Sequence, residues 1–405
     1  MSKKNTTMPE ASMSIPRSRI ILLSPHDPND IGTWSGTAYS VYHALLKSGA
    51  SVETVRATWT DWLVRIVVRL LRKAGIQIDC TRSVIYAYIA SMEASVRLRF
   101  THGEVILAIA AATYVFALKT SRPIIFMSDA TFASISSIYS AFADMPQWLR
   151  EDADKIEREA LRRSDRVLFC SDWARTSAVV DYGVSPAVIS VMPLGPNISN
   201  DLIDRFKTTK SADFRGGVRL LFIGADWDRK GGPTVLDIKR YLDSRGMPCE
   251  LYLVGNCPKD IPAGNGIHVL GRLDKSDEKQ LQELCRLYEL AHFFVLPTSA
   301  EAYGVVFSEA HAFGCPSLTY AVGGTPTAVL DGITGFTLPL GAPATDFAET
   351  ICSLVRDPRQ YEQMSANCRA RYETEANWST WARTVVNLAD QLREQPRASS
   401  VPQNG

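Results

Sequence analysis

Short apolar runs alternate with amphipathic helical patterns along most of the chain. Residues 19–24 (RIILLS) form a nearly continuous apolar run before a proline, as expected for a strand that is buried on both faces. Strand, helix and strand repeated in this way predict a parallel sheet covered by helices on both faces. The pattern predicts a helix over 37–47 and further strands at 51–55, 105–109, 123–127, 166–170 and 188–191.

The alternation is interrupted once and then starts again. Residues 197–217 are polar, lack a clear period and end in two glycines, so we interpret 200–217 as a linker. The flanking segments then predict two doubly wound α/β domains, residues 18–199 and 218–377, because one sheet with so many strands would be exceptional. In the second domain we expect strands at 218–223, 250–254, 268–270 and 293–296 and helices at 232–244 and 276–290.

The two ends of the chain have different patterns. Residues 378–394 are helical in pattern and lie beyond the second domain, so we expect this helix to cross back onto the first. Residues 1–17 and 395–405 are polar, and we expect a flexible N-terminus and a disordered tail.

Composition narrows the class of protein. The chain has 405 residues, of which 46% are hydrophobic and 21% charged, and its formal net charge is +1. Such an even balance argues against nucleic acid as a partner. No apolar run is long enough for a membrane helix, and the start of the chain has no apolar core typical of a secretory signal. The eight cysteines form no CxxC pair, so we expect a cytoplasmic protein without a disulfide framework or a metal clip.

The most informative motif follows the strand predicted at 293–296. Glu301 lies in a short loop, a helix begins near Tyr303 or Gly304, and Glu309 lies eight positions beyond Glu301. Both carboxylates are therefore expected to face one cleft, and the free N–H groups at the helix start favour an anion. A nucleotide sugar offers hydroxyls to the carboxylates and a diphosphate to the amides. We accordingly interpret three backbone N–H groups as phosphate contacts: Gly304, Val305 and Val306.

A basic pair occupies another loop of the second domain. Arg229 and Lys230 follow a predicted strand and precede Gly231 and Gly232, which open a helix. Cations beside helix N–H groups make a diphosphate clamp, although two solvated loop cations would give the same pattern.

Two loops of the first domain are candidates for the opposite wall. Residues 27–37, with Ser35 and Gly36, follow the first strand at the position of a phosphate-contacting loop, or form a plain turn. They lack the GxGxxG pattern of a dinucleotide site. Asp129 follows a predicted strand, where it either orients an acceptor hydroxyl as a weak base or caps the next helix.

These motifs together resemble family 4 of the retaining glycosyltransferases, the glycosyl transferases group 1. The resemblance rests on Glu301 and Glu309, on residues 314–316 (GCP) and on the glycine pair at 323–324. It implies the GT-B architecture, in which two Rossmann-like domains face each other across a cleft. It also implies a retaining hexosyltransferase that takes its sugar from a nucleotide-diphosphate sugar and passes it to an acceptor hydroxyl.

The resemblance assigns roles to single residues. It implies that Glu301 contacts the transferred sugar, that Glu309 binds the ribose hydroxyls, and that Arg229 and Lys230 bind the donor phosphates. It further implies that the backbone at Gly36 approaches the donor phosphate, and that the base is contacted, largely through backbone, by Arg272 and Leu273.

The chain departs from the family pattern at one histidine position. Many relatives place a histidine after the strand at 105–109, where this chain has only alanine and isoleucine; His26 or Asp129 could replace it by position. His311 is interpreted as a core or capping residue. The cations make a metal unnecessary, and the DxD spacing of residues 226–228 is read as loop, so we expect neither metal nor cofactor.

A basic amphipathic stretch in the first domain has two interpretations. Residues 61–73 carry Arg65, Arg69, Arg72 and Lys73 on one helical stripe beside a broad apolar face. Such a helix either lies on the inner face of an anionic membrane or is the solvated side of a packed helix.

Two other classes of function also fit the sequence. The same build suits a nucleotide-sugar epimerase or a glycosyl phosphorylase, and it suits a non-catalytic protein that only binds nucleotide sugar. The residues do not identify the base, the sugar or the acceptor.

Overall fold

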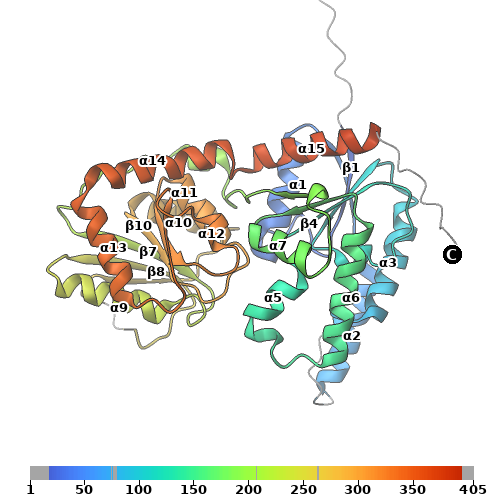
Figure 1. The fold of residues 1–405 in the computed structure, drawn as a ribbon, viewed down its shortest axis with the longest axis horizontal. Helices are drawn as coiled ribbons and strands as arrows, with labels where there is room; N and C mark the ends of the chain where they lie inside the picture. Colours follow the sequence, from blue (N-terminus) through green and yellow to red (C-terminus); the bar gives the residue numbers. More distant parts are fainter. Residues whose placement is uncertain (1–17, 74, 76–79, 207, 262–263, 395–405) are drawn as a thin grey trace, which may run out of the picture.

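The computed structural model describes residues 18–73, 75, 80–206, 208–261 and 264–394. Two parallel sheets of six strands lie in separate halves of this part of the chain, each with helices around it (Figure 1). The predicted fold class is therefore confirmed. The N-terminal and C-terminal segments expected to be flexible lie outside the described residues.

The N-terminal sheet is fully parallel, with the strand order β2-β1-β3-β4-β5-β6. Its central strands β3 and β4 are buried at every residue, because helices cover both faces. The strands are β1 (Arg19–Leu23), β2 (Ser51–Val55), β3 (Val105–Ile109), β4 (Ile124–Ser128), β5 (Arg166–Phe169) and β6 (Ile189–Val191).

Alternate residues of β1 face two different layers of helices. Ile20 and Leu22 belong to the core that also holds Val41 of α1, whereas Ile21 and Leu23 belong to a second core with Ala90 of α3. The helices of this half are η1 (Thr33–Gly36), α1 (Thr37–Lys47), α2 (Thr58–Lys73), η2 (Cys80–Arg82), α3 (Val84–Leu98), α4 (Ala112–Val115), α5 (Phe132–Ile138), η3 (Ser140–Phe142), α6 (Gln147–Arg163), α7 (Asp172–Val180), η4 (Pro186–Val188) and α8 (Asn200–Ile203).

The C-terminal sheet has the order β12-β11-β10-β7-β8-β9. Its strands are β7 (Val218–Gly224), β8 (Cys249–Gly255), β9 (Ile267–Gly271), β10 (Phe293–Leu296), β11 (Ser317–Tyr320) and β12 (Gly335–Leu338). Its helices are α9 (Gly232–Ser244), α10 (Glu278–Leu290), α11 (Val305–Ala312), α12 (Thr325–Ala328), α13 (Ala344–Arg356) and α14 (Pro358–Thr374).

The final helix, α15 (Trp378–Glu394), packs against α1 and β3 of the N-terminal half (Figure 1). The indole N–H of Trp378 donates to the carbonyl of Pro196 at 2.9 Å. Ser18, just before β1, is hydrogen-bonded to Asp390 of the same helix. The chain thus passes between the halves twice, at about residues 192–217 and again at the start of α15.

The interpretation of 200–217 as a linker is wrong for its first part. Residues 200–203 form the short helix α8, and Leu202 and Ile203 are buried in the core. Asn197 is also buried, and its side chain is hydrogen-bonded to Ser40 and to the carbonyl of Ser35. This stretch of backbone is therefore packed between the halves, and its polarity reflects hydrogen bonding at a junction.

Candidate active site

The loop between β10 and α11 carries the first predicted carboxylate. Gly304 precedes α11 with a φ of 83°, in the left-handed region where glycine is favoured, and a Cβ there would lie 2.7 Å from the Phe307 ring. The first N–H groups of a helix have no acceptor within it. At α11 these belong to Gly304, Val305 and Val306, so the predicted anion-binding amides do lie at a helix start.

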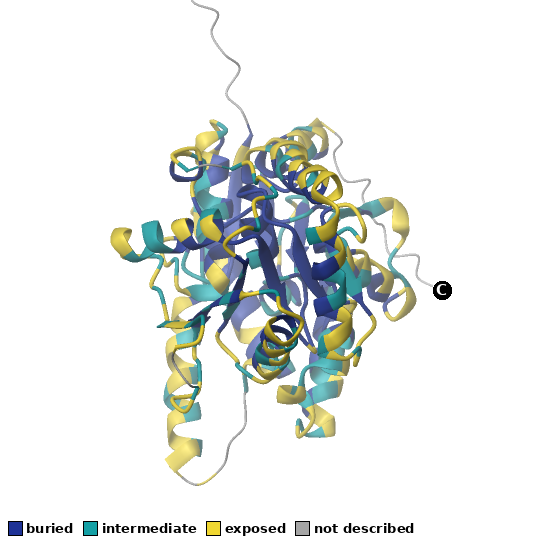
Figure 2. Ribbon diagram, turned by 90° about the vertical axis from the view of Figure 1, so that its left-hand side faces the viewer, coloured by how far each residue is buried: buried dark blue, intermediate teal, exposed yellow. Residues whose placement is uncertain are grey.

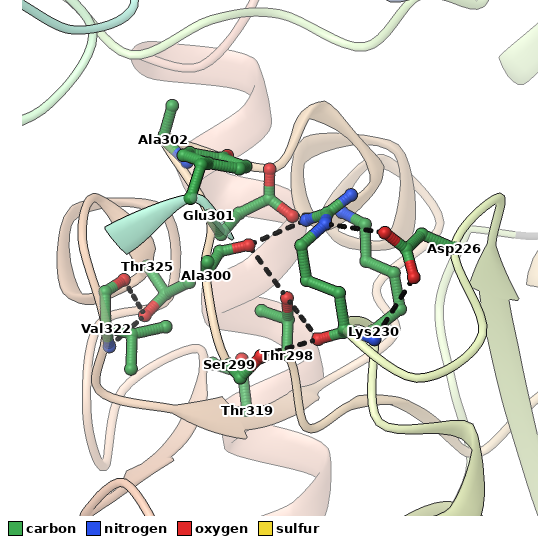
Figure 3. Close-up of polar contacts among 12 residues, drawn as sticks. Asp226, Lys230, Thr298, Ser299, Ala300, Glu301, Ala302, Thr319, Val322 and Thr325 are labelled. Atoms are coloured by element: carbon green, nitrogen blue, oxygen red, sulfur yellow. Dashed lines mark hydrogen bonds and ion pairs between the residues drawn. The ribbon is translucent and has the colours of Figure 1, made fainter. Parts of the chain in front are cut away.

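Glu301 is mostly buried in that loop and its carboxylate forms an ion pair with the ammonium of Lys230 (Figure 3). The loop itself is fixed by its backbone, since the N–H of Gly324 donates to the carbonyl of Glu301 at 3.0 Å. The hydroxyl of Thr298 donates to the carbonyl of Ala300 at 3.0 Å. The structure therefore brings together an acidic and a basic residue that lie 71 positions apart.

Arg229 lies beside the same loop. Its guanidinium donates to the carbonyl of Ala300 at 2.7 Å and to the carboxylate of Asp226 at 3.2 Å. It also lies over the ring of Tyr139, 5.4 Å from the centroid. Tyr139 comes from the N-terminal half, and its hydroxyl accepts a hydrogen bond from the N–H of Ala302 at 3.1 Å. Lys230 thus pairs with Glu301, and Arg229 contacts the adjacent backbone at Ala300, where the two halves touch.

Glu309 lies deeper, and its side chain is fully buried. Its carboxylate pairs with the ammonium of Lys275 and accepts from the hydroxyl of Tyr288 at 2.9 Å and from the N–H of Asn197 at 3.3 Å. A buried charge needs such partners. In this structure the carboxylate is occupied by protein groups from both halves, so a ribose would have to take the place of one of them.

The glycine-bearing loop of the N-terminal half has an uncommon backbone. Trp34 and Ser35 have φ values of 46° and 55°, and Gly36 follows at 85°. Left-handed non-glycine residues are strained and tend to occur at functional sites. Asn197 holds the loop, because its amide donates to the carbonyl of Ser35 at 2.5 Å while its carbonyl accepts from Ser40 at 2.6 Å. One asparagine thereby connects this loop to Glu309.

Asp129 follows β4 and is half-buried beside this loop, where it accepts a hydrogen bond from the indole of Trp34 at 3.2 Å. Burial raises the pKa of its carboxyl. The alternative that Asp129 caps the next helix is wrong, because the N-cap of α5 is Thr131, whose hydroxyl accepts from the N–H of Ser134. Asp129 is left facing a cavity instead.

This cavity has a volume of about 540 Å³ and opens where β1, β3 and β4 end. Glu157 of α6 lines it with a side chain that is 8% exposed, and the Oε1 atom of Glu157 has no hydrogen-bond partner among the described residues. Burial raises the pKa of this carboxyl to about 8. Arginine, aromatic and carboxylate side chains also line the cavity, among them His26, Trp34, Asp61, Arg65, Arg82 and Asp129.

The position after β3, where many relatives have a histidine, also lies at this cavity. Ala110, directly after β3, has a φ of 47° and lines the wall. His26 stacks on Trp34 with ring centroids 5.6 Å apart, and burial together with the charge of Arg56 lowers the pKa of the imidazole. His26 and Asp129, the two substitutes by position, therefore both lie at this wall.

The remaining predicted residues have different surroundings. Tyr303 is buried, and its hydroxyl bonds Ser308 and the carbonyl of Leu194, so only its backbone lies at the helix start. Arg272 is exposed and Leu273 half-buried after β9, at the edge of the sheet. His311 is buried in α11, which confirms its interpretation as a core residue.

Four residues of the site carry no local signal in the sequence: Trp34, Tyr139, Asn197 and Lys275. Each is assigned to the site only by a hydrogen bond to a residue distant in sequence. The partners are Asp129, Ala302, Glu309 and Glu309, at separations of 95, 163, 112 and 34 positions. Among the described residues, no group of three or more His, Cys, Asp or Glu side chains could hold a metal ion, and no helix is long and apolar enough to cross a membrane.

Comparisons with known proteins show which sequences the chain resembles. Residues 217–357 match the family model of the glycosyl transferases group 1. The D-inositol 3-phosphate glycosyltransferase of Frankia alni is 27% identical over 310 residues, which are 70% of this chain and 70% of that protein. The enzyme of the same name from Actinosynnema mirum is 33% identical over 279 residues, which are 64% of each chain.

Solved structures show the same fold. Sucrose-phosphate synthase from Thermosynechococcus elongatus superposes with a TM-score of 0.67 at 20% identity, over 93% of this chain and 99% of that one. Anabaena HepE in complex with UDP-glucose gives a TM-score of 0.58 at 14% identity, over 92% and 99%. Residues 217–357 therefore match the glycosyl transferases group 1, and the chain as a whole has the two-domain GT-B fold.

Proposed function

We propose that this glycosyltransferase transfers a hexose from a UDP-sugar, with retention of configuration and without a metal ion, to a hydroxyl of an acceptor bound in the N-terminal cavity. One observation carries the proposal. The ion pair of Glu301 and Lys230, with Arg229 beside it, lies at the helix start of α11 and at the contact between the two halves.

This arrangement suits a departing diphosphate. Charge grows on the leaving group as the sugar–phosphate bond breaks, and fixed donors lower the barrier most when they are aimed at that charge. Lys230, Arg229 and the free N–H groups of α11 provide such donors at the mouth of the cleft. They offer a stabilisation that does not call for a divalent cation.

Glu301 and Lys230 are expected to exchange partners when the donor binds. In the structure the carboxylate neutralises the ammonium, so neither charge is left unpaired in a mostly buried place. A diphosphate would take over the ammonium, and the freed carboxylate would then accept hydrogen bonds from sugar hydroxyls. Glu309 would act in the same way, with ribose hydroxyls replacing the Lys275 ammonium.

The donor and acceptor classes rest on chemistry supported by the comparisons. Anabaena HepE, of the same fold, was solved with UDP-glucose, which supports uracil as the base. The cavity around Asp129 and Glu157 offers carboxyl groups to hydroxyls, and Arg65 and Arg82 line it as cations. A polyol that bears a negative group fits these walls, and inositol 3-phosphate, in the names of the relatives, is such a compound.

The test begins with thermal unfolding in the presence of UDP-, GDP- and ADP-sugars. A ligand at about 100 times its Kd stabilises the folded state by about 2.7 kcal/mol, so the cognate donor raises the unfolding midpoint. We expect UDP-glucose or another UDP-hexose to do so. A larger shift with a GDP- or ADP-sugar would overturn the assignment of the base.

Release of UDP then identifies the reaction. With UDP-glucose alone we expect slow hydrolysis, and with inositol 3-phosphate added we expect faster release and a glycosylated product with the same anomeric configuration, also in the presence of a chelator. Epimerised donor without acceptor would favour an epimerase, and binding without turnover on any acceptor would favour a non-catalytic protein. Activity that stops with chelator and returns with Mg²⁺ would refute the metal-free scheme.

A further inference from the structure

Large apolar side chains are exposed very unevenly over the molecule. Of the 18 large hydrophobic residues that are exposed in the described part of the chain, 11 lie between Trp59 and Phe100, on α2, on α3 and just beyond it. Single exposed apolar residues are ordinary, whereas a contiguous patch indicates an interaction site. We call these 11 residues the apolar face: Trp59, Trp62, Leu63, Val67, Leu70, Ile85, Tyr88, Ile89, Met92, Val96 and Phe100.

Helix α2 is attached to its domain by one narrow side. Thr60 is buried, and Asp61 points inward, where it accepts hydrogen bonds from the hydroxyls of Tyr86 and Tyr114 at 2.7 and 3.1 Å. The outward positions 59, 62, 63, 67 and 70 repeat with the period of a helix. Figure 2 shows the helix reaching beyond the rest of the domain, with exposed residues along most of its length. Its apolar stripe therefore faces solvent and not a core.

The stripe on α3 continues the one on α2. Exposed apolar residues of α3 occur at positions 85, 88, 89, 92 and 96, again on one side of a helix. The two helices meet at Glu93, whose carboxylate accepts from the N–H of Trp59 at 3.1 Å and from the N–H and hydroxyl of Thr60 at 2.8 Å. Trp59 thereby lies next to the α3 stripe, and the 11 residues form one surface.

A row of cations borders this surface. Arg65, Arg69, Arg72 and Lys73 follow the helical period beside the apolar stripe of α2, and no ion pair to any of the four occurs within the described residues. The only acidic residues of α2 and α3 are Asp61 and Glu93, and both are used in hydrogen bonds between these helices and the domain. The exposed side of α2 is therefore apolar and basic, without a negative charge.

We propose that the apolar face and the adjoining cations dock on an anionic lipid bilayer. Tryptophan and tyrosine prefer the headgroup level, leucine and valine enter the acyl boundary, and arginine and lysine bind anionic headgroups. The inference stands on exposure and charge and does not depend on the proposed reaction. It also gives α2 a second role, because Asp61, Val64 and Arg65 of the same helix line the N-terminal cavity. A docked molecule holds that cavity close to the lipid surface.

Co-sedimentation of the full chain with vesicles tests the proposal. We expect binding to vesicles of phosphatidylcholine with phosphatidylglycerol, weak binding to phosphatidylcholine alone, and loss of binding as salt is raised. Replacing Arg69→Gln and Arg72→Gln together should lower the apparent affinity on the order of tenfold. Replacing Trp62→Ser and Leu70→Ser together should lower it on the order of 100-fold.

Matched variants and a second measurement keep the result interpretable. Ile333→Ser with Leu340→Ser, and Arg240→Gln with Arg356→Gln, remove equally exposed residues of the other half and should leave vesicle binding unchanged. The thermal unfolding midpoint of each variant shows that it is folded. Absent binding to both vesicles, or equal binding to both at every salt concentration, would overturn the proposal. So would a concentration-dependent dimer that the Trp62 and Leu70 substitutions disrupt, because that result assigns the face to a second copy of the chain.

Discussion

The two halves of the molecule hold their polar groups in opposite ways; we call Glu301, Glu309 and their partners the C-terminal wall, and the residues around the cavity at Asp129 and Glu157 the N-terminal wall. On the C-terminal wall each key carboxylate is already paired with an ammonium, Glu301 with Lys230 and Glu309 with Lys275. On the N-terminal wall, burial raises the pKa of the Asp129 and Glu157 carboxyls, and neither has an ion pair within the described residues.

The difference indicates what each wall is built to bind. Paired charges of opposite sign can exchange partners with a ligand that carries both phosphates and hydroxyls, at no cost in unpaired charge. The Glu157 carboxyl, whose pKa is raised to about 8, is mostly protonated at pH 7, so it donates one hydrogen bond and accepts others, which suits an uncharged hydroxyl. This difference supports the proposal that the C-terminal wall binds the nucleotide sugar and the N-terminal wall the acceptor alcohol.

Removing the ammonium of Lys230 should have the largest effect. For Lys230→Met we expect kcat/KM to fall by about 10²- to 10³-fold, the usual loss when one donor to a developing anion is removed. Steady-state release of UDP measures this. Arg240→Met removes an exposed guanidinium of α9 that pairs only within its own helix, and it should leave kcat/KM unchanged.

A double variant separates catalysis from simple stability. Lys230→Met alone leaves Glu301 mostly buried without its partner, at a cost of about 1–3 kcal/mol in the free energy of unfolding. Lys230→Met combined with Glu301→Gln should recover that stability while transfer remains low. Recovery of activity together with stability would show that the ion pair is structural and that the C-terminal wall is not matched to a diphosphate.

The deeper carboxylate should affect binding more than turnover. For Glu309→Gln we expect the donor Kd to rise by about 10- to 100-fold, because hydrogen bonds to a charged acceptor contribute about 1.5–3 kcal/mol. Isothermal calorimetry with the UDP-sugar measures it. Tyr288→Phe is the matched control, since it removes one hydrogen bond to Glu309 but keeps the carboxylate. An unchanged Kd in Glu309→Gln would remove this residue from the donor site.

The difference between the two walls also explains which residues of the site could be predicted from the sequence. Glu301, Lys230 and the helix start at Val305 all lie in or next to loops that follow buried strands, and parallel strands bring such loops to one edge. Apolar runs located most strands to within a residue or two. β11 (SLTY) and β12 (GFTL) were not predicted because serine, threonine and glycine interrupt their apolar pattern.

Only part of the N-terminal wall, including His26 and Asp129, could be predicted from local patterns. Tyr139 is hydrogen-bonded to Ala302, and Asn197 to Ser35 and Glu309. These contacts form only when segments that are distant in the sequence come together. Glu157 looks like any charged residue of a charge-rich helix, and only the packing of α6 shows that it is buried. Burial of a polar residue depends on the tertiary structure, which the helical period alone does not give.

The raised pKa of Glu157 predicts how stability depends on pH. The folded carboxyl has a pKa of about 8 and the unfolded one about 4.5, so the folded state holds a proton that the unfolded state has lost. This stabilisation is complete below pH 4.5 and is lost as pH rises through 8. Between these values it contributes a decrease in the free energy of unfolding of up to about 1.4 kcal/mol per pH unit.

Glu157→Gln tests that slope, because glutamine is neutral at every pH. Chemical unfolding at pH 7 and pH 8 should show a smaller loss of stability in the variant than in the parent chain. The charges around Glu157 are those of Arg82, Asp154 and Asp129, and they are retained. Glu151→Gln alters an exposed residue of the same helix and should keep the parent slope. Equal slopes in all three proteins would refute a neutral carboxyl on the acceptor wall.

The smallest expected effect lies at the contact between the two walls. Tyr139→Phe removes the hydroxyl that accepts from the N–H of Ala302 at 3.1 Å but keeps the ring under Arg229. One neutral hydrogen bond contributes about 1 kcal/mol, so we expect kcat/KM to fall about fivefold with the donor site otherwise intact. Tyr182→Phe is the matched control, because the Tyr182 hydroxyl accepts from the N–H of Ala133 within one domain at 3.0 Å. Both variants should lose similar stability, and only Tyr139→Phe should lose activity. If the two variants behave alike in kcat/KM, the walls work without this bridge, and each can be treated as an independent binding site.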